Sequence, residues 1–239
     1  MISFFKGIFD LLFPPRCLSC HNLLISGEEQ GFCPDCQKRI SILSPPYCQI
    51  CGSPLAAGVQ SSNICHRCSV TAPPFEICRS IGRYDSVLLE AIHALKYQRK
   101  IQAGVVLGKI LSTNVANLLS VGDYDRIIPV PLHKKRLRKR GFNQSLILAK
   151  AIARDFSLPL DFQSLERRVH TDPQIGLGRK QREANVREAF ECVRKDKIVN
   201  LRILLIDDVY TTGSTVRECS RVLLEGGAKS VAVATVARA

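Results

Sequence analysis

Beyond residue 75, apolar residues follow two alternating patterns along the chain. Apolar side chains at helical spacing predict helices over residues 86–97, 103–119, 142–156 and 215–224. Continuous apolar runs of strand length cover residues 126–130, 203–206 and 230–236. Because strands without polar alternation are buried on both faces, the pattern predicts an α/β fold with a parallel sheet between two helical layers.

Before residue 75 the chain carries paired cysteines, prolines and turn residues in place of long apolar segments. The stretch 71–74, which ends in two prolines, predicts a linker, so we expect two domains, 1–74 and 75–239. The opening segment 2–13 has apolar residues on one helical face. This face is typical of a short helix docked on the domain, and a membrane-surface or partner-binding helix is the alternative.

The composition indicates a folded chain with a sizeable core and a strong positive charge. Apolar residues make up 46% and charged residues 23% of the 239 residues, which excludes global disorder. The 34 basic residues exceed the 21 acidic residues by 13. This excess indicates a polyanionic partner, whether nucleic acid, a phosphate compound or an anionic membrane surface.

Eleven cysteines are many for a chain of this length, and they bear on its compartment. A disulfide framework would imply secretion. The first residues show no basic region ahead of the apolar stretch, and Lys6 and Asp10 interrupt that stretch before it reaches bilayer-spanning length. We therefore expect a cytoplasmic protein without a transmembrane segment, in which clustered cysteines bind metal.

Eight of the cysteines form two similar blocks with two residues between the members of each pair. The first block is Cys17, Cys20, Cys33 and Cys36, and the second is Cys48, Cys51, Cys65 and Cys68. This spacing lets both thiolates of a pair reach one Zn²⁺, and two pairs complete a closed structural site. We expect two structural zinc ions in a double zinc ribbon. The spacing leaves open cross-pairing between the blocks and replacement ligation by His21 or His66.

The most informative stretch runs from residue 204 to residue 215. A buried strand delivers Asp207 and Asp208 at its carboxyl end, where ligands of open α/β sheets bind. Hydroxyl residues and a glycine follow and lead into a helix, namely Thr211, Thr212, Gly213, Ser214 and Thr215. Such a loop binds phosphate through backbone N–H groups, hydroxyls and the helix dipole. An ordinary helix cap beside a solvated acidic turn is the structural alternative.

The acid pair narrows the class of ligand. Carboxylates repel phosphate, so Asp207 and Asp208 are expected to bind sugar hydroxyls or Mg²⁺. A ligand that offers both a phosphate and a diol is a ribose phosphate. The lysine of an ordinary nucleotide-binding P-loop is missing, which excludes a site of that type.

This stretch resembles the signature of type I phosphoribosyltransferases, and the whole chain resembles the ComF family of competence-associated proteins. The matching segments are 12–14 with 17–20, 94–97, 129–133 and 140–144, followed by Thr171, Gln174, Leu177, Arg179, Arg182, Asn185 and Phe190. The resemblance implies a Rossmann-like type I phosphoribosyltransferase fold with an N-terminal double zinc ribbon. It implies phosphoribosyl pyrophosphate (PRPP) as the ligand, with Mg²⁺ bridging its pyrophosphate and ribose oxygens. Asp207 and Asp208 would then hold the ribose hydroxyls, and residues 211–215 the 5′-phosphate.

Pyrophosphate needs positive charge nearby, and three places in the sequence offer it. The basic run from His133 to Arg140 follows a strand end, so we expect contact with pyrophosphate or a nucleic-acid backbone; a solvated basic loop is the alternative. Lys96 would contact pyrophosphate or only end its helix. Residues 167–187 are expected to close over the site with Arg179 and Arg182 reaching phosphates, and an ordinary surface loop is the alternative.

Three functions fit these features. The first is an enzyme that transfers ribose 5-phosphate from PRPP to an amine or base. The second is a protein that binds single-stranded DNA during natural transformation and uses PRPP as a regulatory ligand. The third is a zinc-stabilised adaptor that docks on a protein of the DNA-uptake machinery. We favour a PRPP-binding, phosphoribosyltransferase-like protein that supports DNA uptake; no residue in the sequence stands out as a base that would activate an acceptor.

Overall fold

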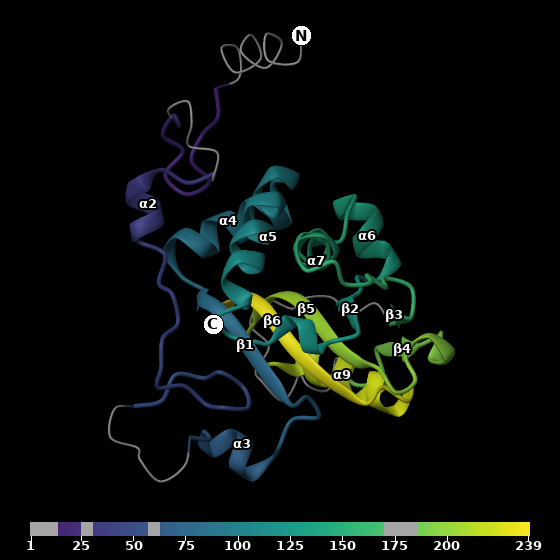
Figure 1. Cartoon of the computed structure of the whole chain (residues 1–239). Helices are drawn as coiled ribbons and strands as arrows, with labels where there is room; N and C mark the ends of the chain where they lie inside the picture. The colour runs from purple at the N-terminus through teal and green to yellow at the C-terminus, as the bar shows by residue number, and fades with distance from the viewer. Residues whose placement is uncertain (1–13, 25–30, 57–62, 170–185) are drawn as a thin grey trace.

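A four-stranded parallel sheet forms the centre of the computed structural model, which describes residues 14–24, 31–56, 63–169 and 186–239 (Figure 1). Its strands are β1 (Ile77–Arg83), β2 (Arg126–Pro129), β5 (Arg202–Tyr210) and β6 (Ser230–Arg238). They are arranged in the order β1-β6-β5-β2, and each neighbouring pair is parallel. The two longest strands, β5 and β6, therefore lie in the middle of the sheet.

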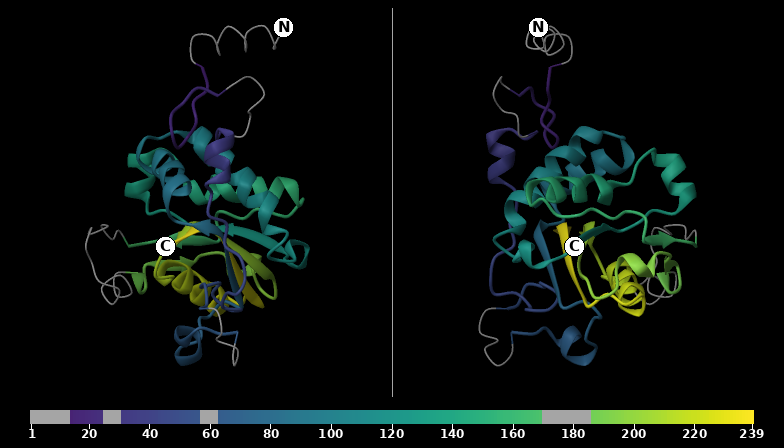
Figure 2. Two further views of the ribbon diagram at one scale, coloured as in Figure 1. Left: turned by 90° about the vertical axis from the view of Figure 1, so that its left-hand side faces the viewer. Right: turned by 45° about the vertical axis from the view of Figure 1, so that its right-hand side comes forward.

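Helices cover both faces of the sheet, which confirms the predicted α/β architecture (Figures 1 and 2). One face carries α4 (Ser86–Tyr97), α5 (Ile101–Val115) and α7 (Gln144–Asp155). The other face carries α9 (Ser214–Glu225) and the antiparallel pair β3 (Leu165–Arg167) and β4 (Phe190–Cys192). Along β5, Leu204 and Ile206 pack into the first layer, whereas Ile203 and Leu205 pack into the second.

Small residues let α5 lie close against α7. A Cβ added to Gly104 would lie 3.0 Å from the side chain of Ile147, and one added to Gly108 would lie 3.0 Å from the Cβ of Ala151. Larger side chains at these glycines would push the two helices apart. The close packing holds the start of α7 at the carboxyl ends of β2 and β5.

The remaining elements match, extend or add to the predicted ones. Helix α4 has the predicted bounds, whereas β5 continues past residue 206 through the acid pair, because its backbone keeps pairing with β6 up to Tyr210 and Arg238. The elements β1, β3, β4, η1 (Val121–Asp123) and η2 (Lys195–Lys197) were not predicted. The predicted helix over 2–13 and most of the predicted closing segment 167–187 lie outside the described residues. No helix in the described part of the chain is both long and apolar enough to cross a bilayer.

The basic run, for which a solvated loop was the alternative to a ligand contact, is a helix, α6 (Lys134–Arg140). His133 is its N-cap, because its Nδ1 accepts a hydrogen bond from the backbone N–H of Lys135. Gly141 ends the helix in the left-handed conformation, with φ of 89°. The sequence showed no sign of this helix, because α6 buries no residue and so has no apolar periodicity to reveal it.

The two cysteine blocks lie on opposite faces of the sheet (Figure 2). Cys17 and Cys36, beside α2 (Pro34–Lys38), pack into the core that includes α4 and α5. Cys48, Cys51 and Cys68, beside α3 (His66–Val70), pack into the core that includes α9. The cysteine-rich part of the chain therefore contributes to both layers of the fold.

The chain between the two cysteine blocks runs along the outer edge of β1. The backbone N–H of Leu43 donates to the carbonyl of Ile81 (2.9 Å), and that of Arg83 donates to the carbonyl of Ser41 (2.8 Å). An uncovered strand edge is a template for unwanted pairing with another chain. This segment covers the edge and ties residues before 74 to the sheet, and the domain boundary at residues 74 and 75 stays a prediction.

Candidate functional site

Asp207 and Asp208 lie near the carboxyl end of β5, and both are buried. Neighbouring residues of a strand project to opposite sides, so the two carboxylates meet different partners. The Asp207 carboxylate accepts hydrogen bonds from Oγ of Ser145, in the first turn of α7 (2.9 Å), and from the backbone N–H of Asp208 (2.9 Å). The Asp208 carboxylate forms an ion pair of 2.6 Å with Nζ of Lys96, in the last turn of α4. Three elements far apart in the sequence thus assemble this site.

Burial controls the charge of the acid pair. Loss of hydration and the neighbouring charge of Asp208 raise the pKa of Asp207 from 3.8 to about 7, although Lys96 and Ser145 act in the opposite direction. Burial alone would lower the pKa of Lys96, but the Asp208 carboxylate outweighs this effect and raises it. Near neutral pH, Asp207 is therefore poised between its protonated and its charged form.

The loop after β5 turns at Gly213, directly before α9. Gly213 has a φ of 77°, and a Cβ at this position would lie 2.3 Å from Oη of Tyr210, so only glycine fits. The hydroxyls of Thr212 and Ser214 lie 2.9 Å apart. Thr211 is exposed and Thr215 is half-buried in the same loop. The loop therefore gathers hydroxyls at the N-terminus of a twelve-residue helix, an arrangement suited to an anion.

The basic residues that were predicted to bind phosphate differ in their distance from the acid pair. Lys96 is brought into direct contact with the acid pair. Burial lowers the pKa of Arg140 while the Asp208 charge raises it, so this guanidinium also lies within the electrostatic reach of the pair. His133 caps α6, and its contact with a ligand stays a prediction. Arg179 and Arg182 lie outside the described residues.

Beyond the predicted residues, Ser145 lies at the acid pair, and Arg167 and Tyr84 lie within its electrostatic reach. Ser145 contacts Asp207 directly, and its place next to the matched 140–144 segment is the signal that would have found it. Arg167 of β3 lies over the ring of Phe190 (5.2 Å); burial lowers its pKa and the charge of Asp207 raises it. Burial raises the pKa of Tyr84, which Lys96 lowers. Arg167 opens the segment 167–187 that was expected to close over the site, whereas no local pattern marks Tyr84.

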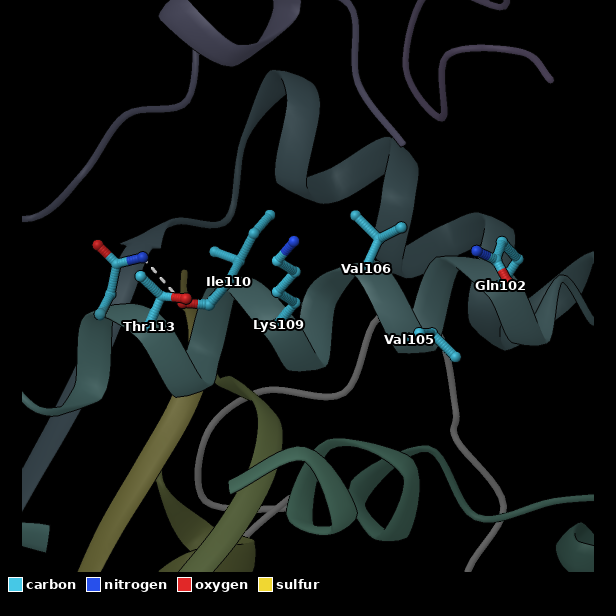
Figure 3. Close-up of a pocket in the computed structure, with 7 residues that line it drawn as sticks. Gln102, Val105, Val106, Lys109, Ile110 and Thr113 are labelled. Atoms are coloured by element: carbon cyan, nitrogen blue, oxygen red, sulfur yellow. Dashed lines mark hydrogen bonds between the residues drawn. The ribbon is translucent and has the colours of Figure 1, made fainter. Parts of the chain in front are cut away.

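A separate pocket of about 270 Å³ lies over α5 (Figure 3). Its apolar wall consists of Val105, Val106 and Ile110, and Lys109 is among its polar residues. Within the described ranges, all the lining residues belong to α5, and neither the acid pair nor the loop is among them. The pocket is therefore distinct from the acid pair and the loop 211–215.

The eight paired cysteines gather into two sets of four, one from each block. Within each set the sulfur atoms all lie within 4.8 Å of one another. The Sγ atoms of Cys20 and Cys33 are 3.7 Å apart, as are those of Cys51 and Cys65. A zinc–thiolate tetrahedron with Zn–S bonds of about 2.3 Å has sulfur atoms about 3.8 Å apart. Each set therefore fits one structural Zn²⁺ without cross-pairing between blocks or a histidine ligand.

In each set, hydrogen bonds lower the pKa of some thiols, whereas burial and neighbouring thiols raise the pKa of others, namely Cys20, Cys33, Cys51 and Cys68. Burial opposes ionisation of Cys17 and Cys48, but backbone N–H groups outweigh it and lower each pKa from 9.0 to about 6. Burial also opposes ionisation of Cys36, but Arg39 donates to its Sγ (2.9 Å) and the net effect lowers its pKa. The thiolate is the form that binds zinc. The unpaired cysteines are buried in the α9 core as expected for small apolar residues, namely Cys78, Cys192 and Cys219.

Known proteins match both parts of the chain. A double zinc ribbon domain model matches residues 8–82, and a phosphoribosyl transferase domain model matches residues 143–239. Competence protein F of Haemophilus influenzae is 34% identical over 229 residues, which cover 94% of this chain and 97% of that protein. DNA utilization protein YhgH of Salmonella typhimurium is 32% identical over 230 residues, which cover 93% and 96%. A solved structure of glutamine PRPP amidotransferase from B. subtilis, complexed with ADP and GMP, is 21% identical over 61% of this chain and 30% of that chain, with a TM-score of 0.42.

Because the two cysteine sets are separate, we predict that each binds its zinc ion independently of the other. The native protein should carry two zinc ions per chain, because each set is complete by itself. The Cys20→Ser/Cys33→Ser variant and the Cys51→Ser/Cys65→Ser variant should each carry one. Elemental analysis of the purified proteins measures this ratio. A native protein without zinc, or loss of both ions from either variant, would contradict the assignment.

The raised pKa of Asp207 predicts how stability depends on pH. A carboxyl whose folded pKa lies above its unfolded value stabilises the fold most at low pH, and that contribution is lost as the pH rises from about 4 to 7. Asp207→Asn removes this loss, so its free energy of unfolding relative to that of the wild type should rise by on the order of 1–2 kcal/mol between pH 5.5 and pH 8, as measured by denaturant titration at each pH. Asp196→Asn is the control, because the Asp196 side chain is 73% exposed. Equal pH dependence in both variants would refute the buried, raised-pKa state of Asp207.

Proposed function

The chain belongs to the competence protein F family, and from this premise we propose that it binds PRPP with Mg²⁺ at the carboxyl end of β5 and supports DNA uptake. One observation carries the proposal: a buried acid pair is followed directly by a glycine and hydroxyl loop that opens α9. The loop suits a phosphate, and the carboxylates suit hydroxyl donors or a cation. PRPP offers all of these groups in one molecule.

Each part of the ligand has a matching part of the site in this proposal. The 5′-phosphate lies in the loop 211–215, where N–H groups and hydroxyls donate to its oxygens. The ribose hydroxyls donate to Asp207 and Asp208, and hydrogen bonds to charged acceptors are the stronger kind. Because Lys96 already pairs with Asp208, it lies where a pyrophosphate oxygen could replace the carboxylate as its partner.

The pyrophosphate carries most of the ligand's charge and needs the basic side of the site. Lys96 and Arg140 lie within reach of the acid pair, and His133 and the predicted contacts of Arg179 and Arg182 add to them. The carboxylate oxygens of Asp207 and Asp208 are donors of the type that Mg²⁺ prefers. When bound, Mg²⁺ neutralises charge on the pyrophosphate.

Transfer of the ribose phosphate is the enzymatic form of this proposal. The bond between ribose C1 and the pyrophosphate oxygen breaks, and an amine or base of the acceptor forms a new bond to C1. The contributions of the protein are to stabilise the leaving pyrophosphate with its basic groups and to exclude water from the oxocarbenium-like centre.

A second candidate function, binding of single-stranded DNA, is favoured by α6. Four of its basic side chains are exposed to solvent, and the chain as a whole has a net charge of +13. A row of this kind binds a phosphate backbone without reading its sequence. PRPP would then be a regulatory ligand, or the chain would act as an adaptor for a protein of the DNA-uptake machinery. Eight thiols in zinc sites suit a reducing compartment, so we place this function in the cytoplasm.

The PRPP site is tested by titration calorimetry with Mg²⁺ present. The wild type should bind PRPP saturably in the micromolar range. The Asp207→Asn/Asp208→Asn variant should lose at least about 100-fold in affinity, because two charged acceptors are replaced by neutral amides. The Asp123→Asn/Asp196→Asn variant removes two exposed carboxylates and should bind as the wild type does. A zinc-loaded wild type that does not bind PRPP would refute the proposed ligand.

The role of α6 is tested separately with a fluorescent single-stranded oligonucleotide. Replacing Lys134, Lys135, Arg138 and Lys139 with alanine should weaken DNA binding and reduce the slope of log K against log salt by about 2 to 3, because four phosphate contacts are lost. PRPP affinity should fall far less than DNA affinity, since His133 and Arg140, the residues of the run that the proposal assigns to pyrophosphate, are kept. Unchanged DNA affinity and slope would remove α6 as the DNA surface.

A further inference from the structure

The second cysteine set lies against the loop that the proposed function assigns to the 5′-phosphate. Arg67 stands between two of its cysteines, Cys65 and Cys68, in the first turns of α3. Its guanidinium Nη2 donates a hydrogen bond to the backbone carbonyl of Thr212, which lies 145 residues further along the chain. A zinc knuckle and the phosphate loop are therefore in direct contact.

A second connection runs from the same cysteine set to the same loop. Arg238, at the end of β6, donates from Nη1 to the carbonyl of Cys51 (2.7 Å), and its Nη2 lies 3.7 Å from the Cys51 sulfur. The same guanidinium lies over the ring of Tyr210, 4.2 Å from its centroid. The hydroxyl end of Tyr210 is the group against which Gly213 packs. Contacts thus continue from a zinc ligand to the glycine at which the loop turns.

The second set is also anchored to the sheet independently of the loop. The backbone N–H of Cys78, on β1, donates to the carbonyl of Ile50, between Cys48 and Cys51 (2.7 Å). Gly52 packs so closely that a Cβ there would lie 2.7 Å from the carbonyl of Cys78. This half of the zinc ribbon is therefore fixed to β1 and can act as a rigid support. The first set packs instead beside α5, where Gly31 faces Val106.

We infer that the second cysteine set, with zinc bound, holds the phosphate loop in its binding shape through Arg67, which is a positioning residue for that loop. The Arg67 guanidinium donates to the Thr212 carbonyl. This carbonyl oxygen therefore points at a positive charge and not at a phosphate that enters the loop. Zinc fixes the two cysteines on either side of Arg67, so it fixes the direction from which the guanidinium approaches. Occupancy of the second set, and not of the first, then controls affinity for a phosphate ligand. This inference rests on the proposed function of the loop.

The test compares matched positions in the two knuckles. Arg67 occupies the third position of the 65–68 knuckle, and Asp35, which is exposed, occupies the same position in the 33–36 knuckle. Arg67→Met should keep two zinc ions and a near-native circular dichroism spectrum, yet lose about tenfold or more in PRPP affinity, because a charge-assisted hydrogen bond is lost. Arg67→Lys should recover part of this loss. Asp35→Ala should bind as the wild type does.

Hydrogen exchange of the peptide that contains residues 211–216 supplies a measurement that needs no ligand. Arg67→Met should raise the exchange rate of this peptide, and Asp35→Ala should leave it unchanged. If the wild type does not bind PRPP but Arg67→Met raises the exchange rate, the support role stands and the proposed ligand falls. If Arg67→Met binds PRPP as the wild type does and exchanges at the same rate, the inference is overturned. Loss of zinc from Arg67→Met would also overturn it, because the residue would then act on the metal site itself.

Discussion

Asp207 and Asp208 carry their carboxylates into a buried position at the end of β5, where neither is fully hydrated. Burial of a charge costs several kcal/mol unless partners compensate it, and a like charge beside it adds to the cost. The compensation comes from Lys96 on one carboxylate and from Ser145 on the other. The last turn of α4 and the first turn of α7 must therefore both lie at the carboxyl end of β5. The packing of the helical layer holds them there.

A buried acid pair maintained at this cost is suited to binding. Burial and the charge of Asp208 raise the pKa of Asp207, and a cation bound at the carboxylates would offset both effects. The loop 211–215 would have the opposite requirement in binding a phosphate, because it would have to present donors and no negative charge. The turn at Gly213 separates the two requirements along the chain: acids precede it on the strand, and hydroxyls and the helix N-terminus surround it.

The two cysteine sets solve different structural problems with the same chemistry. Each occupies a segment too short to build a core of its own, and a metal ion supplies the missing folding energy. The first set extends the helical layer beside α5, and the chain after it covers the edge of β1. The second set lies at the ligand end of the sheet and contacts the loop through Arg67. The same four-cysteine motif therefore lies on both faces of the sheet, beside α5 on one face and beside the loop before α9 on the other.

Features whose chemistry lies in contiguous residues were evident from the sequence. The cysteine pairs predicted two four-cysteine sets, and the stretch 204–215 predicted a buried strand that carries an acid pair and a glycine and hydroxyl loop that opens a helix. The alternation of apolar patterns predicted the α/β architecture, and the spacing in α4 was regular enough to predict its bounds. Helix α6 was the exception, because it buries no side chain and therefore leaves no periodic pattern.

Only the tertiary structure decided which distant residues meet. Ser145 reaches Asp207 across 62 residues and Arg67 reaches Thr212 across 145, and a parallel sheet brings such positions together through its strand order. The assignment of the two cysteine sets to opposite faces likewise depends on which core each one can enter. Local spacing determines which groups can ionise, bind metal or turn the chain, whereas their charges and partners depend on burial, and burial is a property of the whole fold.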